Sequence, residues 1–167
     1  MTGTPERLTK IMQLKINGIW FYGLAGSGKS FASKCLMSKL EKGFMVDGDE
    51  VRKYISTDLN YTADHRKIQL KRLLGISKLA LLNGFVPIVS SVTMNKEILD
   101  KCIDAGIDVV EIDRSEVDRY ETRNIYLTES NVVGVDIELE RLNTHKIFNC
   151  GTHLFEQEIS QYVNQAR

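Results

Sequence analysis

A glycine-rich segment has the residue types and spacing of a phosphate-binding loop. The pattern G-x-x-x-x-G-K-S is matched by Gly23, Leu24, Ala25, Gly26, Ser27, Gly28, Lys29 and Ser30. Glycines let the backbone curl around an anion so that several N–H groups point at it, and the positive end of a following helix faces the same anion. The pattern predicts that Lys29 reaches the β- and γ-phosphates of ATP and that Ser30 is a Mg²⁺ ligand. The alternative is a glycine-rich turn with a chance lysine, and the strand and helix expected on either side argue against it.

Two carboxylates, Asp47 and Asp49, follow the next expected strand. Ligands of open α/β sheets bind at the carboxyl ends of the strands, so we expect both carboxylates near the phosphates. One could orient a Mg²⁺-bound water and one could accept a proton from an acceptor hydroxyl. The spacing does not decide which does which, and an ordinary Asp-Gly turn explains it equally well.

Basic residues come next. Arg52 lies one helical turn beyond Asp49, and Arg66 opens a further expected helix with Gln69 on the same face. Arginine suits a bidentate grip on phosphate or sulfate, although a solvated helix face is an equal alternative for Arg66.

Three basic residues occur later in the chain. Arg119 and Arg123 flank a segment without periodicity, where an arginine could stabilise a transferring phosphoryl group or simply end a solvated helix. Lys146 could meet a phosphate or be a surface residue.

Hydrophobic periodicity predicts a scaffold in which strands alternate with helices. Strands are expected at 16–22, 44–46, 85–92, 108–112 and 145–149. Helices are expected at 30–41, 62–82, 96–105, 115–123 and 153–165, the first three ended by Gly43, Gly84 and Gly106. The apolar face of the second helix is assigned to Ile68, Leu73, Leu74, Ile76, Leu79 and Leu82. This alternation implies a three-layer α/β/α fold of the P-loop NTPase type, with a parallel sheet of about five strands.

The remainder of the chain adds a tail and a lid. Residues 1–14 are polar and predict a loose tail, and 15–167 are expected to form a single domain. Residues 124–137 lack a clear period and predict a short, mobile lid. Trp20 and Phe21 are expected in the core, whereas the three histidines lack metal-ligand spacing and are interpreted as non-catalytic.

Composition excludes several classes of partner. The 22 basic residues balance the 22 acidic ones, so no net field indicates a nucleic-acid polymer or an anionic membrane. Cys35, Cys102 and Cys150 form no C-x-x-C pair, which argues against a disulfide framework and for a reducing compartment. No apolar run suits a signal peptide or a bilayer span, so a cytoplasmic protein is expected. The sequence leaves the oligomeric state open, a homodimer included.

Taken together, these residues resemble the adenylylsulfate (APS) kinase family. Residues 47–52 (DGDEVR) are similar to the family's D-G-D-N-V-R, after a family-like G-L-x-G-S-G-K-S, and residues 58–66 (DLNYTADHR) are similar to D-L-G-F-S-x-x-D-R. The likeness is good over roughly 18–92 and weak beyond. It implies transfer of the γ-phosphate of Mg-ATP to the 3′-hydroxyl of adenylyl sulfate. Asp49, alone or with Asp47, would be the base and Mg²⁺ organiser, and Arg52 and Arg66 would hold the acceptor's anionic end.

The departures from the family pattern fall on the acceptor side. Gln69 replaces an asparagine, Ser91 a phenylalanine that would stack on the base, and Thr93 a serine. A valine, Val132 or Val133, replaces the second aromatic residue, which lies in the lid, and the lid's basic run is absent. Stacking on a base is worth ~1–3 kcal/mol, so losing two rings predicts an acceptor other than adenylyl sulfate. The residues expected at the acceptor are Arg52, Arg66, Gln69, Ser90, Ser91, Val92, Thr93 and Lys146.

A small anionic nucleotide is therefore the expected substrate. A branch of APS-kinase-like enzymes phosphorylates cytidine diphosphoramidate in capsule-sugar modification, and its pyrimidine needs a smaller clamp, so this acceptor is favoured by analogy. The alternatives are an authentic adenylylsulfate kinase, a kinase of another small alcohol such as a sugar acid, and a non-catalytic ATP-binding module. The intact Lys29, Ser30, Asp47 and Asp49 argue against the last.

Overall fold

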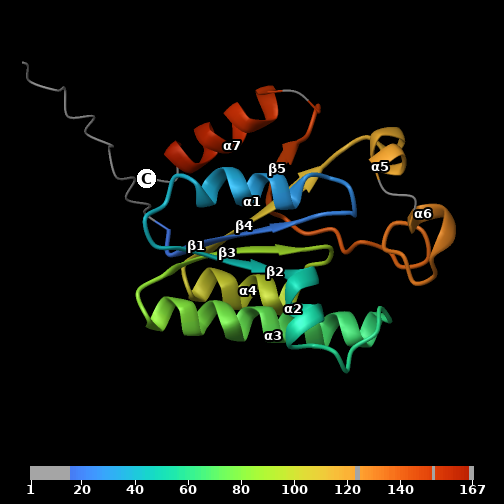
Figure 1. The fold of residues 1–167 in the computed structure, drawn as a ribbon, viewed down its shortest axis with the longest axis horizontal. Coiled ribbons are helices and arrows are strands. Elements are labelled where there is room, and N and C mark those ends of the chain that lie inside the picture. Colours follow the sequence, from blue (N-terminus) through green and yellow to red (C-terminus); the bar gives the residue numbers. More distant parts are fainter. Residues whose placement is uncertain (1–15, 123–124, 152, 166–167) are drawn as a thin grey trace, which may run out of the picture.

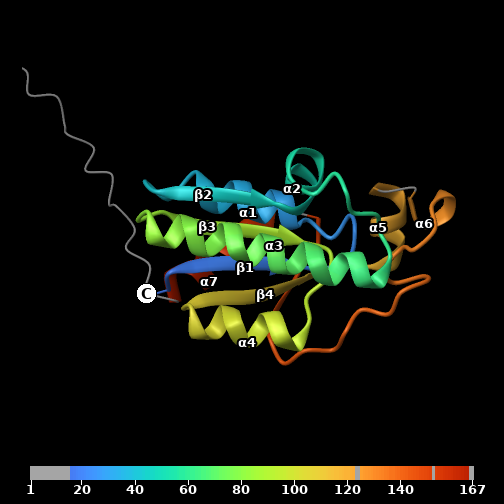
Figure 2. The same cartoon turned by 90° about the horizontal axis from the view of Figure 1, so that it is seen from below.

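A computed structural model of the chain describes residues 16–122, 125–151 and 153–165 (Figure 1). Five parallel strands form one sheet in the order β2-β3-β1-β4-β5, which Figure 2 shows for its first four strands. The strands are β1 (Gly18–Tyr22), β2 (Gly43–Asp47), β3 (Val86–Ser91), β4 (Ile107–Asp113) and β5 (His145–Phe148). The predicted α/β class with about five parallel strands is confirmed.

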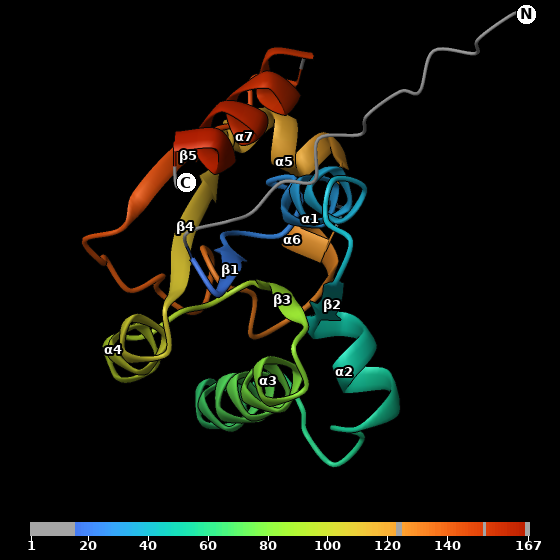
Figure 3. The ribbon, with the colours of Figure 1, turned by 90° about the vertical axis from the view of Figure 1, so that its left-hand side faces the viewer.

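Helices cover both faces of the sheet (Figure 3). One face carries α1 (Lys29–Met37) and α7 (His153–Gln165), and the other carries α3 (Ala63–Leu82) and α4 (Lys96–Asp104). Three short helices, α2 (Gly48–Tyr54), α5 (Glu116–Thr122) and α6 (Ile125–Thr128), lie toward the carboxyl ends of the strands (Figure 1). In the described part of the chain, no helix is both long and apolar enough to cross a membrane.

The central strand β1 has apolar packing on both sides because its side chains alternate between the faces. Trp20 and Tyr22 belong to the hydrophobic cluster under α3 and α4, and Ile19 and Phe21 to the cluster under α1 and α7. All four are fully buried, as predicted for Trp20 and Phe21. Directly after this fixed strand comes the glycine-rich loop, so the core determines where that loop begins.

The first helix ends earlier than predicted. It stops at Met37 with Ser38 as a right-handed C-cap, and Gly43 opens β2 instead of ending the helix. A Cβ at Gly43 would lie 2.7 Å from the Met37 sulfur, so the end of this helix packs closely against the start of β2. Gly84 and Gly106 follow their helices with φ of +76° and +70°, as C-cap glycines do.

The apolar face predicted for α3 was partly wrong. Ile68, Leu79 and Leu82 are exposed, whereas Leu73 and Leu74 are buried as predicted. Docking on the sheet also buries Ser77, whose hydroxyl donates to the Leu73 carbonyl, so a polar residue occupies the inner face without an unpaired group.

Two short helices were not predicted. The first is α2, which begins directly after Asp47. The second is α6, which lies in the expected lid together with an isolated bridge between Val133 and Ile137. The expected tail, 1–14, and residues 123–124 lie outside the described part of the chain.

Candidate active site

A cavity of about 900 Å³ opens at the carboxyl ends of the central strands. The glycine-rich loop lines one side, and the turn at Asp47–Asp49 and the start of α3 line another. Residues between 125 and 133, in the segment predicted to be a lid, and the loop after β5 line further parts of its wall. Most of the predicted site residues therefore share one space.

The glycine-rich loop adopts a conformation that only glycines accept easily. Gly23, Gly26 and Gly28 have φ of +151°, +79° and +107°. A Cβ at Gly23 would lie 2.1 Å from the Ile112 carbonyl oxygen, and one at Gly28 would lie 2.4 Å from Nδ2 of Asn149. The predicted order of strand, loop and helix is confirmed, because β1 ends at Tyr22 and α1 begins at Lys29.

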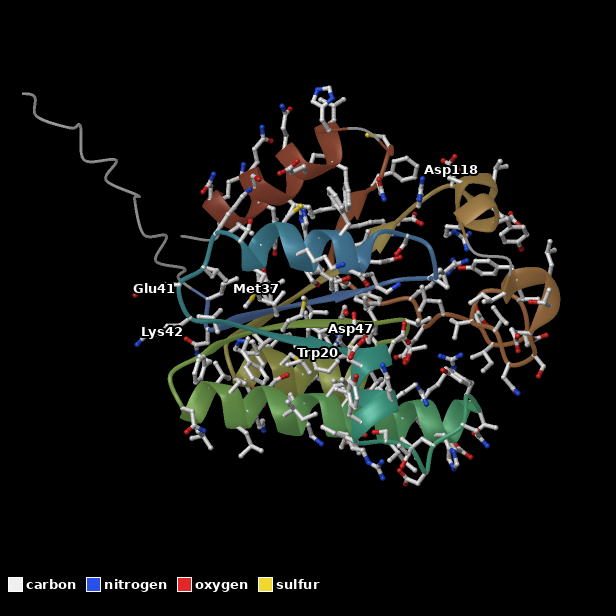
Figure 4. All side chains as sticks on the ribbon, viewed as in Figure 1. Trp20, Met37, Glu41, Lys42, Asp47 and Asp118 are labelled. Atoms are coloured by element: carbon white, nitrogen blue, oxygen red, sulfur yellow. The ribbon has the colours of Figure 1, made fainter. Side chains whose placement is uncertain are left out.

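Asp47 lies where β2 meets α2 (Figure 4), and both of its carboxylate oxygens accept hydrogen bonds. Oδ1 accepts from the backbone N–H groups of Asp49 at 2.9 Å and Glu50 at 3.3 Å, which caps α2. Oδ2 accepts from the hydroxyls of Ser90 at 2.6 Å and Ser30 at 3.4 Å. These contacts join the carboxylate to the phosphate-binding loop.

The pair formed by Ser30 and Asp47 fits Mg²⁺. The ion prefers hard oxygen ligands and, beside substrate phosphates, usually takes only one or two from the protein. A hydroxyl and a carboxylate oxygen 3.4 Å apart provide that set at the start of α1.

Asp49 is exposed on the first turn of α2 and lines the cavity. Its charge acts on two half-buried arginines, Arg52 and Arg66. Burial lowers the pKa of both guanidiniums, and the neighbouring charge of Arg52 lowers the pKa of Arg66 further. An anion beside these arginines would offset that cost, so the pair favours a negatively charged ligand.

The two arginines lie against the ring of Tyr61, a residue that was not predicted to belong to the site. Their guanidinium carbons lie 4.4 Å and 5.4 Å from the centre of its ring. Arg52 donates to the Asn60 carbonyl at 2.9 Å, and Arg66 donates to those of Tyr61 at 3.0 Å and Asn131 at 2.9 Å. The ring lines the cavity and is 52% exposed, so an aromatic surface remains at the expected acceptor side. Its position within the D-L-N-Y stretch, matching the family's D-L-G-F, was the available signal.

Gln69 and Ser91, the last residue of β3, mainly hold the backbone. Gln69 is buried and donates from Nε2 to the Gly48 carbonyl at 3.0 Å. The Ser91 hydroxyl accepts from Trp20 Nε1 at 2.8 Å and donates to the Thr93 carbonyl at 2.6 Å. The cavity is lined by Gly48, Gln69, Ser91, Val92 and Thr93, whereas Trp20 is not among its lining residues.

Three predicted basic residues are placed differently from the rest. Arg119 donates to the Arg114 carbonyl at 3.1 Å and to the Tyr126 hydroxyl at 3.3 Å and is not among the cavity-lining residues, whereas Arg114 is. Lys146 is ion-paired with Glu111 at 3.2 Å outside the cavity lining, which favours its surface role. Arg123 lies outside the described residues.

Comparisons with known proteins agree with this architecture. A family model described as adenylylsulphate kinase matches residues 15–124. A probable adenylyl-sulfate kinase of Halalkalibacterium halodurans is 30% identical over 102 residues, which are 56% of this chain and 49% of that protein. The chain thus spans about half the length of the curated relatives it matches.

Among solved structures, the Mycobacterium tuberculosis APS kinase CysC in complex with AMPPNP and APS superposes with a TM-score of 0.78 and 22% identity, covering 88% of this chain and 95% of that one. A gluconokinase from Sinorhizobium meliloti 1021 superposes with a TM-score of 0.63 and 16% identity, covering 92% of this chain and 97% of that one. At these identities the two structures bear on the fold alone.

Proposed function

The chain belongs to the adenylylsulphate kinase family, and from this premise we propose that it transfers the γ-phosphate of ATP to the 3′-hydroxyl of a small anionic nucleotide. The observation that carries the proposal is the turn at Asp47–Asp49. Asp47 contacts Ser30 of the phosphate-binding loop, and two residues later Asp49 lines the same cavity as Arg52 and Arg66. A donor phosphate and an anionic acceptor would therefore meet on either side of one short turn.

On the donor side, the loop would hold the phosphates through its N–H groups and the amino group of Lys29. That amino group donates to the Leu24 carbonyl at 2.9 Å, so it already lies against the loop. Ser30 and Asp47 would hold Mg²⁺, which neutralises charge on the phosphates when bound.

On the acceptor side, we assign the proton-accepting role to Asp49. The four hydrogen bonds on the Asp47 carboxylate hold it in place, whereas Asp49 faces the cavity from the surface of α2. Arg52 and Arg66 would hold the acceptor's anionic group, and the Tyr61 ring would contact its base. Most of the rate enhancement would come from this positioning and charge neutralisation.

The residues of the lid bear on which nucleotide is accepted. Val132 and Val133 are buried and line the cavity, so an aromatic surface is available at Tyr61 but not at these two positions. Adenylyl sulfate is the acceptor that family membership suggests first. The absence of a ring at these two positions supports cytidine diphosphoramidate as the second candidate, because a pyrimidine offers less area for stacking.

The test is ADP release with a panel of acceptors. It compares adenylyl sulfate, cytidine diphosphoramidate and the 3′-deoxy analogue of each. We expect one parent nucleotide to stimulate ADP release and its 3′-deoxy analogue to give none. If the protein binds ATP but no acceptor raises release above background, the proposed function is wrong.

A further inference from the structure

Three consecutive carbonyl oxygens of the phosphate-binding loop are held by side chains from outside it. The Tyr126 hydroxyl on α6 donates to the Ala25 carbonyl. Nη1 of Arg114, directly after β4, donates to the Gly26 carbonyl at 3.2 Å. Nδ2 of Asn149, directly after β5, donates to the Ser27 carbonyl at 2.8 Å.

The carbonyls on either side are satisfied within the loop and its helix. The Leu24 carbonyl accepts from the Ser27 N–H at 3.1 Å and from Lys29, and the Gly28 carbonyl accepts from the Ala32 N–H at 3.0 Å. The outside side chains therefore serve the stretch that the local backbone does not. Each of the five carbonyls from Leu24 to Gly28 has a donor.

Holding the carbonyls also determines the direction of the N–H groups. In a trans peptide, the C=O of one residue and the N–H of the next point in opposite directions. With the Ala25 and Ser27 carbonyls bonded to the protein, the N–H groups of Gly26 and Gly28 face the other way. Gly26 and Gly28 line the cavity, whereas Ser27 between them is fully buried.

We propose that Tyr126, Arg114 and Asn149 are positioning residues for the donor phosphates, a set that we call the carbonyl brace. They come from three separate elements and would keep the loop in its phosphate-binding conformation before ATP arrives. Preorganised donors need not reorient on binding, which makes the interaction stronger. This inference rests on the proposed function, because it assumes that the loop binds the phosphates of ATP.

Two members of the brace are rigidly held. The Tyr126 ring is buried, stacks on Tyr120 at 4.7 Å and lies 5.4 Å from the Arg119 guanidinium. Burial raises the pKa of Tyr126, so its hydroxyl remains a donor at neutral pH.

Two hydrogen bonds fix Asn149 in addition to its bond to Ser27. Its N–H donates to the Asp113 carbonyl at 2.7 Å, and its Oδ1 accepts from the Gly151 N–H at 2.8 Å. Its amide nitrogen occupies the space that a side chain at position 28 would need. Asn149 therefore connects the end of β4 and the loop after β5 to the phosphate-binding loop.

The test compares Tyr126→Phe with Tyr120→Phe. The first variant removes only the hydroxyl that reaches Ala25 and keeps the ring in its stack. The second variant removes the hydroxyl of Tyr120, the ring stacked on Tyr126. That hydroxyl bonds to Glu116 and not to the phosphate-binding loop. Asn149→Ala is compared in the same way with Asn83→Ala, because Asn83 donates to the Leu79 carbonyl at the end of α3, a site outside the cavity lining.

Titration calorimetry with ATP and with inorganic tripolyphosphate provides the readout. Tyr126→Phe should weaken both ligands about three- to tenfold, which corresponds to about 0.6–1.4 kcal/mol. The acceptor KM should stay unchanged, and Tyr120→Phe should bind like the wild type. A lower melting temperature with unchanged dissociation constants would mean that the tyrosine is merely structural and would overturn the brace.

The same titrations separate the brace from the proposed function. A wild-type protein that binds ATP and turns over, beside brace variants with unaltered affinities, would refute the brace alone. A wild-type protein that binds neither ATP nor tripolyphosphate would refute both.

Discussion

Replacing Asp47 and Asp49 by alanine, one at a time, should affect different properties. We expect Asp47→Ala to lower mainly stability and Asp49→Ala to lower mainly turnover. Asp47→Ala removes the side-chain cap of α2, which is worth about 1 kcal/mol. It also removes a charged hydrogen bond to the Ser90 hydroxyl, worth about 1.5–3 kcal/mol, and leaves that hydroxyl buried without this partner. We expect a loss of about 2–4 kcal/mol in the free energy of unfolding, or roughly 5–15 °C in melting temperature for a chain of this size.

Asp49→Ala should cost far less stability. The carboxylate is exposed, and its contribution to the start of α2 is at most about 1 kcal/mol. Its backbone N–H still donates to Asp47 in the variant. Turnover should nevertheless fall by about 10²-fold or more, the usual contribution of a general base, with ATP affinity nearly intact.

The assay pairs thermal unfolding with single-turnover transfer to the active acceptor. Asp49→Asn serves as the isosteric control, because it keeps the size of the side chain and removes its basicity together with its negative charge. Equal melting temperatures for the two alanine variants would refute the assignment of Asp47 as the structural carboxylate. Normal turnover in Asp49→Asn would move the role of the base to Asp47.

Three further changes test the remaining parts of the site. Lys29→Ala should abolish transfer, and a variant with normal activity would contradict the phosphate-binding role of the loop. Tyr61→Ala should weaken acceptor binding roughly 5- to 150-fold, the range that corresponds to ~1–3 kcal/mol for stacking on a base, while ATP affinity stays constant; an unchanged acceptor KM would exclude the ring from base binding. Asp58 lies outside the cavity lining, and its hydrogen bonds to Arg72 lower its pKa from 3.8 to about 2. Because the folded-state pKa is the lower one, its stabilisation is present above pH ~4 and lost as the pH falls through about 2. Denaturant titrations should therefore show Asp58→Asn less stable than the wild type at pH 5–7 and a shrinking difference below pH 4, whereas a constant difference would contradict the linkage.

The donor half of the site was predictable because its chemistry dictates residue types at fixed spacing. A loop that wraps a phosphate needs Gly23 and Gly28 where a Cβ would collide, and the helix must start where the anion sits. The position of Asp47 followed from topology, since parallel strands end at the same edge of a sheet. Its role as the cap of α2 was indicated by the acidic residues that follow it, Asp49 and Glu50, because these residue types favour the start of a helix. The pattern of the preceding strand was the stronger signal, so this helix was not predicted.

The acceptor half was less predictable because its residues act through contacts that distant parts of the chain create. Ser91 stands where a stacking ring was expected, yet its hydroxyl joins Trp20 to the Thr93 carbonyl. The prediction that two rings are lost overlooked Tyr61, whose ring is placed by arginines from α2 and α3. The prediction of the apolar face of α3 was partly wrong for a similar reason. The surface on which the helix docks, and not the helix's own pattern, decides which leucines are buried.

The carbonyl brace shows why part of a phosphate-binding site escapes motif analysis. Residues that touch the phosphate are confined to glycine, lysine and serine by geometry and charge, so they recur at fixed spacing. A carbonyl that faces away from the phosphate accepts a hydrogen bond from any donor. A phenol, a guanidinium and an amide perform that task here, from positions 126, 114 and 149. Neither the type nor the spacing of such residues is constrained, so only the folded structure brings them together. We therefore expect the loop's affinity for phosphate to depend on residues that lie about 90 to 120 positions away in the sequence.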